Sequence, residues 1–118
     1  MRKTLQVVAW LFLIVIAVLT LSPPTYRPIT VLPHDLEHLS IFVAAGLAYG
    51  LGYVGGVTAH LPVLIVFSAT IELAQIWDPG RHARLSDFVV NVVGVMIGLM
   101  LASMLRRYRW PRLIIAAD

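Results

Sequence analysis

The chain has 118 residues, of which 59% are hydrophobic and 13% are charged, and its mean hydropathy is +0.87. Soluble domains carry about 25% charged residues, so this composition excludes a water-facing globule, and the absence of cysteine excludes disulfides, thiolate catalysis and Cys-ligated metal centres. The net charge is +3, but the basic residues gather mainly at the two ends beside apolar segments, which favours contact with anionic lipid headgroups over binding of nucleic acid.

The first apolar run extends from Leu5 to Leu21 and follows two basic residues. It has features of a secretory signal, but its length and the proline at position 23 argue against cleavage. We therefore expect a retained membrane helix over about residues 5–22. The next stretch, 23–33, contains four prolines and predicts a loop.

A second span is expected over residues 34–56, and it carries Gly46 and Gly50 four residues apart. Small residues at this spacing let two membrane helices approach closely. Residues 57–60 predict a tight turn, and a third span is expected over residues 61–78. The Asp-Pro-Gly-Arg sequence at the end of this span favours a type II turn.

The fourth span is expected over residues 86–105, with Ser86 as its N-cap. Gly94 and Gly98 lie on one face of this span, and we expect them to pack against a neighbouring helix. Residues 106–118 combine arginine with aromatic side chains and predict a basic tail at the membrane interface.

The basic residues also predict the orientation. If both ends lie on one side of the membrane, that side holds six Lys and Arg residues and the other side holds three. The positive-inside rule then places both termini in the cytoplasm. The sequence therefore predicts one all-α domain over residues 1–118, a four-helix transmembrane bundle with both termini cytoplasmic.

Polar residues occur in three of the spans, at the ends that this topology places outside. By helical rise, Glu72 lies roughly 8 Å below the outer boundary, where a carboxylate costs at least about 2.5 kcal/mol, so it should face the bundle interior or a water-filled pocket. Spacings of three and four residues place Gln75 on the face of Glu72, and Asn91 on the face of Asp87. We expect a polar pocket formed by seven residues: His38, Glu72, Gln75, Arg81, Arg84, Asp87 and Asn91.

Each part of this pocket also has a structural interpretation. The polar side chains inside the bundle would then be interhelical hydrogen-bonding partners, worth about 0.6 kcal/mol per contact. Asp87 would only complement the helix dipole, and Arg81 and Arg84 would belong to a solvated loop. The histidines near the start of the second span have ligand-like spacing but no HExxH signature, so we expect no metal and no cofactor.

The pattern from the third span onward resembles the VanZ-like family of small bacterial membrane proteins. The match consists of Glu72-x-x-Gln75, Gly80-Arg81, and Asp87-x-x-x-Asn91 followed by Gly94 and Gly98. A weaker match is His38 with Phe42, although His34 and Asp35 stand where the family often has an Asp-Lys pair. The resemblance covers roughly residues 33–105. It implies a multi-pass protein of the bacterial cytoplasmic membrane, in a family whose founding member is linked to teicoplanin resistance.

We expect the chain to act at the outer face of that membrane, in the handling of an envelope component or in the response to a glycopeptide antibiotic. We expect it to contact membrane lipids and to bind a lipid-linked envelope precursor or a glycopeptide. We expect no nucleic acid among its partners. The alternative is an intramembrane hydrolase or transferase on a lipid-linked substrate, with Glu72 and Asp87 as acid–base residues. A pore-forming protein does not require polar residues concentrated at one end of its spans. A transporter is less favoured because four short spans offer little of the internal symmetry that transporters show. Whether the chain forms a homo-oligomer is left open.

Overall fold

The computed structural model describes the backbone of residues 2–26, 31–77 and 84–115 and, apart from Pro24, their side chains as far as Tyr108. These residues form four long helices, α1 (Arg2–Leu21), α2 (His34–Gly52), α3 (Val57–Ala74) and α4 (Leu85–Ile115), and two short 3₁₀ turns, Pro24–Tyr26 and Gln75–Trp77. No strand occurs in this described part of the chain. The predicted all-α fold is confirmed.

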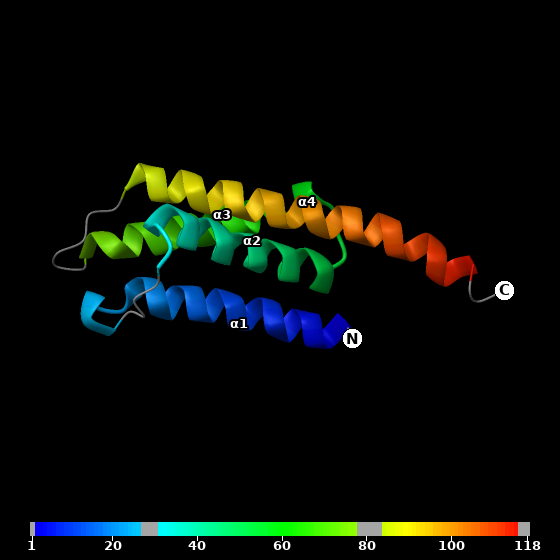
Figure 1. Cartoon of the computed structure of the whole chain (residues 1–118), viewed down its shortest axis with the longest axis horizontal. Helices are drawn as coiled ribbons and strands as arrows, with labels where there is room; N and C mark the ends of the chain where they lie inside the picture. Colours follow the sequence, from blue (N-terminus) through cyan, green and yellow to red (C-terminus); the bar gives the residue numbers. More distant parts are fainter. Residues whose placement is uncertain (1, 27–30, 78–83, 116–118) are drawn as a thin grey trace.

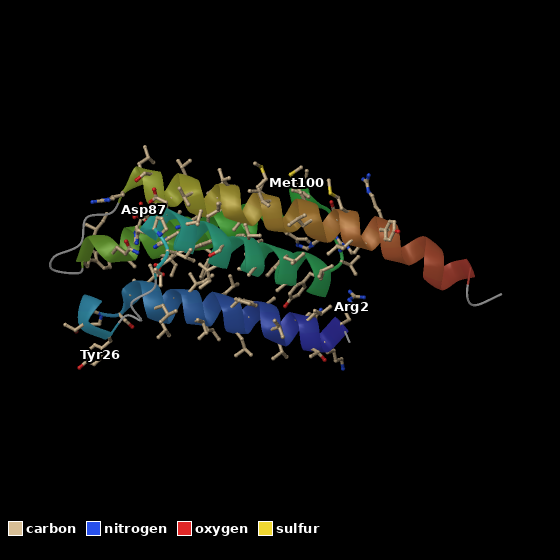
Figure 2. All side chains as sticks on the ribbon, in the orientation of Figure 1. Arg2, Tyr26, Asp87 and Met100 are labelled. Carbon is tan, nitrogen blue, oxygen red and sulfur yellow. The ribbon has the colours of Figure 1, made fainter. Side chains whose placement is uncertain are left out.

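Helix α2 lies at the centre of the bundle, where it packs against both α1 and α4, while α3 packs mainly on α4 (Figure 1). Helices α2 and α4 run in the same direction, and α1 and α3 run in the opposite direction. We call the end at which α2 and α4 begin, with His34 and Asp87, the polar end. The opposite end, with Arg2 and Arg106, is the basic end; Figure 2 shows Asp87 and Arg2 at these two ends.

Three helical segments are long and apolar enough to cross a membrane: Arg2–Leu21, Val57–Trp77 and Leu85–Tyr108. Helix α2 falls short because polar residues occupy four of its first five positions. Large apolar side chains on α1 and α4, such as Trp10 and Met100, are about half exposed, as expected for surfaces that meet lipid. Three of the four predicted spans thus have the length and composition that a membrane crossing requires.

Glycines let α2 and α4 approach closely. All four predicted packing glycines, Gly46, Gly50, Gly94 and Gly98, lie in this interface. A Cβ atom on Gly46 would lie 2.5 Å from the carbonyl oxygen of Val95, and one on Gly98 would collide with the carbonyl oxygen of Val43. Because the obstacles at these two positions are backbone atoms, only glycine permits this separation of the helices.

The reversal between α2 and α3 lies earlier than predicted. Helix α2 ends at Gly52 and α3 begins at Val57, so residues 57–60 form a helical turn, and their prediction as the connection was wrong. The connection instead uses Gly55, whose φ of +152° is one that L side chains rarely adopt. His60 is consequently buried in the first turn of α3, with its ring 5.4 Å from that of Tyr49 between centroids.

A residue from the far end of the chain holds this connection. The Arg106 guanidinium donates hydrogen bonds to the carbonyl oxygens of Tyr53 at 2.9 Å and Gly55 at 2.6 Å. The indole N–H of Trp10 also donates to the Tyr53 hydroxyl at 2.7 Å, which ties α1 to the same place. The basic end is therefore fixed by contacts from α1 and α4.

Replacing Arg106 with methionine should lower the free energy of unfolding by about 1–2 kcal/mol, because two charge-assisted hydrogen bonds to the connection are lost. Thermal unfolding in a neutral detergent measures the change. Arg107→Met is the matched control, since Arg107 is exposed and adjacent. Equal losses in the two variants would show that charge at the interface, and not the bonds to the connection, is what matters.

Both predicted boundaries of the fourth span differ from the structure. Helix α4 begins at Leu85, with the Arg84 carbonyl accepting from the amides of Asp87 and Phe88, so Ser86 is not the N-cap. The helix also continues through Ile115, so the first part of the predicted basic tail, residues 106–115, is a continuation of α4. The change from apolar to basic residues marks the end of the apolar segment and does not break the helix.

Candidate functional site

Two polar contacts join α2 and α4 at the polar end. The ring Nδ1 of His38 lies 3.1 Å from Oδ1 of Asn91, which is 1% exposed. Because Asn91 Oδ1 is an acceptor, Nδ1 of His38 is the donor in this bond. One turn closer to the end of the bundle, Nε2 of His34 lies 3.5 Å from Oδ2 of Asp87.

Glu72 brings α3 into the same region. Its Oε1 accepts a hydrogen bond of 2.7 Å from the backbone N–H of Arg84, where the chain enters α4. Asp87, His34 and His38 lie close enough to act electrostatically on the Glu72 carboxyl group. The carboxylate therefore anchors the start of α4. Together with His34, His38, Asp87 and Asn91 it forms one cluster, which we call the polar cluster.

Two oxygens of α3 are buried without a hydrogen-bond partner in the described residues. They are Oε2 of Glu72, a residue that is 7% exposed, and Oγ of Ser68, a residue that is completely buried. Leaving such a group unpaired typically costs about 1–3 kcal/mol. The cluster thus has unused capacity for hydrogen bonds, centred on the carboxylate that the sequence singles out.

The structure places the predicted pocket residues as follows. His38, Glu72, Asp87 and Asn91 meet at the polar end through the contacts above, and Gln75 is buried in the 3₁₀ turn that follows α3. Arg84 contributes its backbone amide, while the residue itself is exposed. Arg81 lies outside the described residues.

Two participants were not among the predicted pocket residues, His34 and Ser68. Each precedes a predicted residue by four positions, His38 and Glu72 respectively, so each shares a helical face with it. This spacing could have identified both. The role of Arg84 had no such signal, because a backbone amide leaves no trace in the sequence.

The contacts of Asp87 bear on what chemistry the site can perform. The Ser86 hydroxyl donates to Oδ1 of Asp87 at 3.2 Å, while His34 approaches Oδ2. Asp87 therefore stands between the serine and the histidine, whereas a hydrolytic triad places the histidine between the serine and the acid. Among the described residues, no three His, Cys, Asp or Glu side chains are grouped so as to hold a metal ion.

Comparison with known proteins identifies the family. No curated protein and no solved structure gave a match to the chain. The profile of the VanZ/LLP1 family matches residues 33–106, well over half of the chain, which include α2, α3 and the apolar part of α4. Every described residue of the polar cluster lies within this range. The chain therefore belongs to the VanZ/LLP1 family of membrane proteins.

Proposed function

We propose that this protein is a multi-pass protein of the bacterial cytoplasmic membrane in which α2 crosses the bilayer with the other three helices. The position of α2 between α1 and α4 supports this, because helices that span on either side would carry it through the membrane. In the sequence, six Lys and Arg residues flank the start of α1 and the end of the apolar part of α4, and three lie between α1 and α2 or between α3 and α4. By the positive-inside rule both termini are then cytoplasmic, and the polar end faces outside.

The polar cluster then recognises an envelope component at the outer face of the membrane, a lipid-linked envelope precursor or a glycopeptide. The observation that carries this proposal is the buried Glu72 carboxylate with an unpartnered oxygen. Sugar hydroxyls and peptide amides supply the N–H and O–H donors that such an acceptor lacks. The exposed Arg84, with Arg81 three residues earlier in the sequence, would meet a phosphate or carboxylate of the same molecule.

Antibiotic susceptibility tests the proposal directly. In a glycopeptide-susceptible bacterium that expresses the chain, the wild type should raise the inhibitory concentration of teicoplanin, and Glu72→Gln should reduce that increase about tenfold, the effect of losing about 1.4 kcal/mol of binding. Thr70→Val is the control, because Thr70 is exposed two residues away on the same helix. Equal protection by Glu72→Gln and wild type would remove Glu72 from the function.

Binding of a lipid-linked envelope precursor needs a separate measurement. Purified protein in lipid nanodiscs should retain a lipid-linked cell-wall precursor, and Glu72→Gln should release it while Thr70→Val retains it. Retention without any effect on teicoplanin susceptibility would select the precursor over the glycopeptide. Failure of the wild type in both assays would contradict the proposed recognition.

One observation favours the enzymatic alternative. The His34 side chain is 48% exposed and is held by an Asp87 side chain that is 10% exposed, which is how a carboxylate orients a general base at the edge of a site. In this alternative Asp87 acts through His34, and Glu72 is the second acid–base group. Purified protein should then release product from a lipid-linked precursor, and Asp87→Asn should abolish the release. Absence of turnover by the wild type would reject the alternative.

A further inference from the structure

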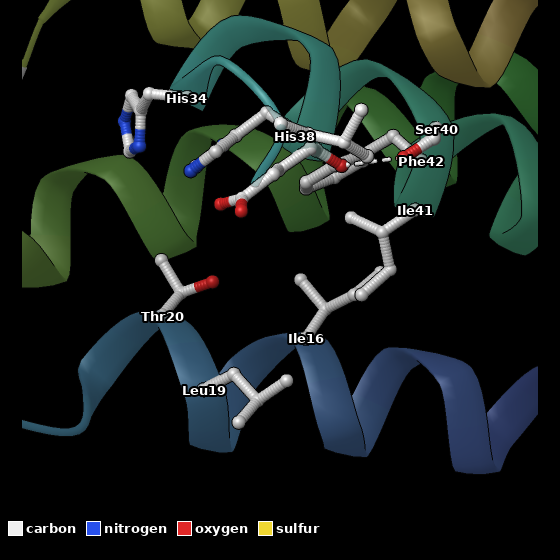
Figure 3. Close-up of a pocket in the computed structure, with 10 residues that line it drawn as sticks. Ile16, Leu19, Thr20, His34, His38, Ser40, Ile41 and Phe42 are labelled. Carbon is white, nitrogen blue, oxygen red and sulfur yellow. Dashed lines mark hydrogen bonds between the residues drawn. The ribbon is translucent and has the colours of Figure 1, made fainter. Parts of the chain in front are cut away.

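A pocket of about 280 Å³ lies between the last turns of α1 and the first turns of α2. Figure 3 shows Ile16, Leu19 and Thr20 of α1 on one side of it and Ile41 of α2 on the other. The cavity is slightly smaller than the roughly 300–1,000 Å³ of pockets that take drug-sized molecules. It can hold one small headgroup with the beginning of a chain, but not a glycopeptide.

The lining changes character with depth. The lining residues nearest the polar end are Thr20, one residue before the end of α1, and His34 and Glu37, in the first turn of α2. Ile16 and Ile41 lie about one turn deeper on the same two helices, and Phe42 beside them is 1% exposed. A polar rim above an apolar floor, at the level where a helix leaves the membrane, fits an amphiphile standing upright in the bilayer.

Charge selects the kind of headgroup. The Glu37 carboxylate lines the pocket and makes no ion pair with any described residue. The lining contains no Lys or Arg, and its two basic side chains, His34 and His38, contact Asp87 and Asn91. A second carboxylate, Asp35, lies two residues before it in the first turn of α2. This rim repels an anionic headgroup and attracts a cation, and a cation with N–H groups can also donate charge-assisted hydrogen bonds to Glu37.

We propose that the pocket between α1 and α2 binds an aminophospholipid of the surrounding membrane, with its primary ammonium group on Glu37 and the start of an acyl chain against Ile16, Ile41 and Phe42. The ligand is thus of the phosphatidylethanolamine type. A phosphatidylcholine headgroup carries the same charge but has no N–H to donate, and a phosphatidylglycerol headgroup is anionic. The pocket shares His34 and His38 with the polar cluster, but the inference rests on Glu37 and holds whether or not Glu72 recognises an envelope component.

The test measures which lipid the purified full chain retains. The protein in a neutral detergent is incubated with equal amounts of phosphatidylethanolamine, phosphatidylcholine and phosphatidylglycerol that share the same acyl chains, and bound lipid is counted by native mass spectrometry. The wild type should retain phosphatidylethanolamine about tenfold more often than either of the others. Equal retention of the three lipids would overturn the proposal.

Three variants locate the lipid. Glu37→Gln should abolish the preference, whereas Asp35→Asn should keep it, because Asp35 carries the same charge nearby but does not line the pocket. Ile41→Trp should fill the cavity and reduce retention of all three lipids. Thermal unfolding confirms that each variant is folded before its lipids are counted. A preference that survives Glu37→Gln, or that Asp35→Asn removes equally, would place the selective contact elsewhere and overturn the proposal.

Discussion

Replacing Gly98 with alanine is expected to lower the free energy of unfolding by about 2–3 kcal/mol, although alanine is the better helix former by about 1 kcal/mol. The added Cβ atom would collide with the carbonyl oxygen of Val43 and lie 2.6 Å from the amide nitrogen of Leu47. Both obstacles are backbone atoms of α2, which cannot rotate away as a side chain would. Helices α2 and α4 must therefore move apart.

Gly56→Ala provides the matched control for this loss. A Cβ atom on Gly56 would meet only the hydroxyl of Thr58, at 3.8 Å, and its φ of −88° suits any residue. Thermal unfolding midpoints of the two variants and the wild type, in one detergent, give the comparison. If Gly98→Ala and Gly56→Ala have the same thermal unfolding midpoint, the close approach of α2 and α4 is not what stabilises the bundle.

The same substitution should also disturb the polar end. Asn91 lies seven residues before Gly98, two turns along the same face of α4, and Gly94 lies between them against Leu39 and Phe42. Separating the helices at Gly98 would lengthen the contact between Asn91 and His38. The glycine face thus sets the register in which the polar side chains of α2 and α4 meet.

The features that could be predicted from the sequence depend on helical periodicity and on the membrane. Spacing places Asp87 and Asn91 on one face, and the alternation of spans brings Glu72 to the same end as both, without any knowledge of contacts. The glycine pairs indicate a close interface in the same way. What the sequence does not reveal is which residues face each other across it, because the pairing of His34 with Asp87 depends on the register of α2 along α4.

The features that could not be predicted depend on contacts between distant residues. The position of the reversal between α2 and α3 had a local signal, the dipeptide Gly55–Gly56, which favours a turn before residue 57. The contact that holds this connection could not be predicted, because Arg106, which donates to the carbonyl oxygens of Tyr53 and Gly55, lies about fifty positions later. The pocket at Glu37 was missed for the same kind of reason, since nothing in the sequence shows that α1 packs beside α2.

Glu72→Gln is expected to unfold at the same temperature as the wild type or higher. The amide oxygen of glutamine can still accept the hydrogen bond from the Arg84 backbone, so the anchor of α4 is kept. The oxygen that is lost has no partner in the described residues, and a neutral amide is less costly to bury than a carboxylate. A buried charge that lowers the stability of the bundle, and is nevertheless present, is what we expect of a functional site.

Two further variants make the stability measurement decisive. Glu72→Ala removes the acceptor of the Arg84 amide and should lose about 1–3 kcal/mol, which shows that the assay detects damage at this position. Asp87→Asn should lose less than about 1 kcal/mol, since its partner His34 is half exposed and the remaining benefit is a charge at the start of α4. If Glu72→Gln instead loses as much as Glu72→Ala, the carboxylate charge itself holds the bundle together. The cluster would then be a structural network, and recognition would have to be sought at the exposed Arg84.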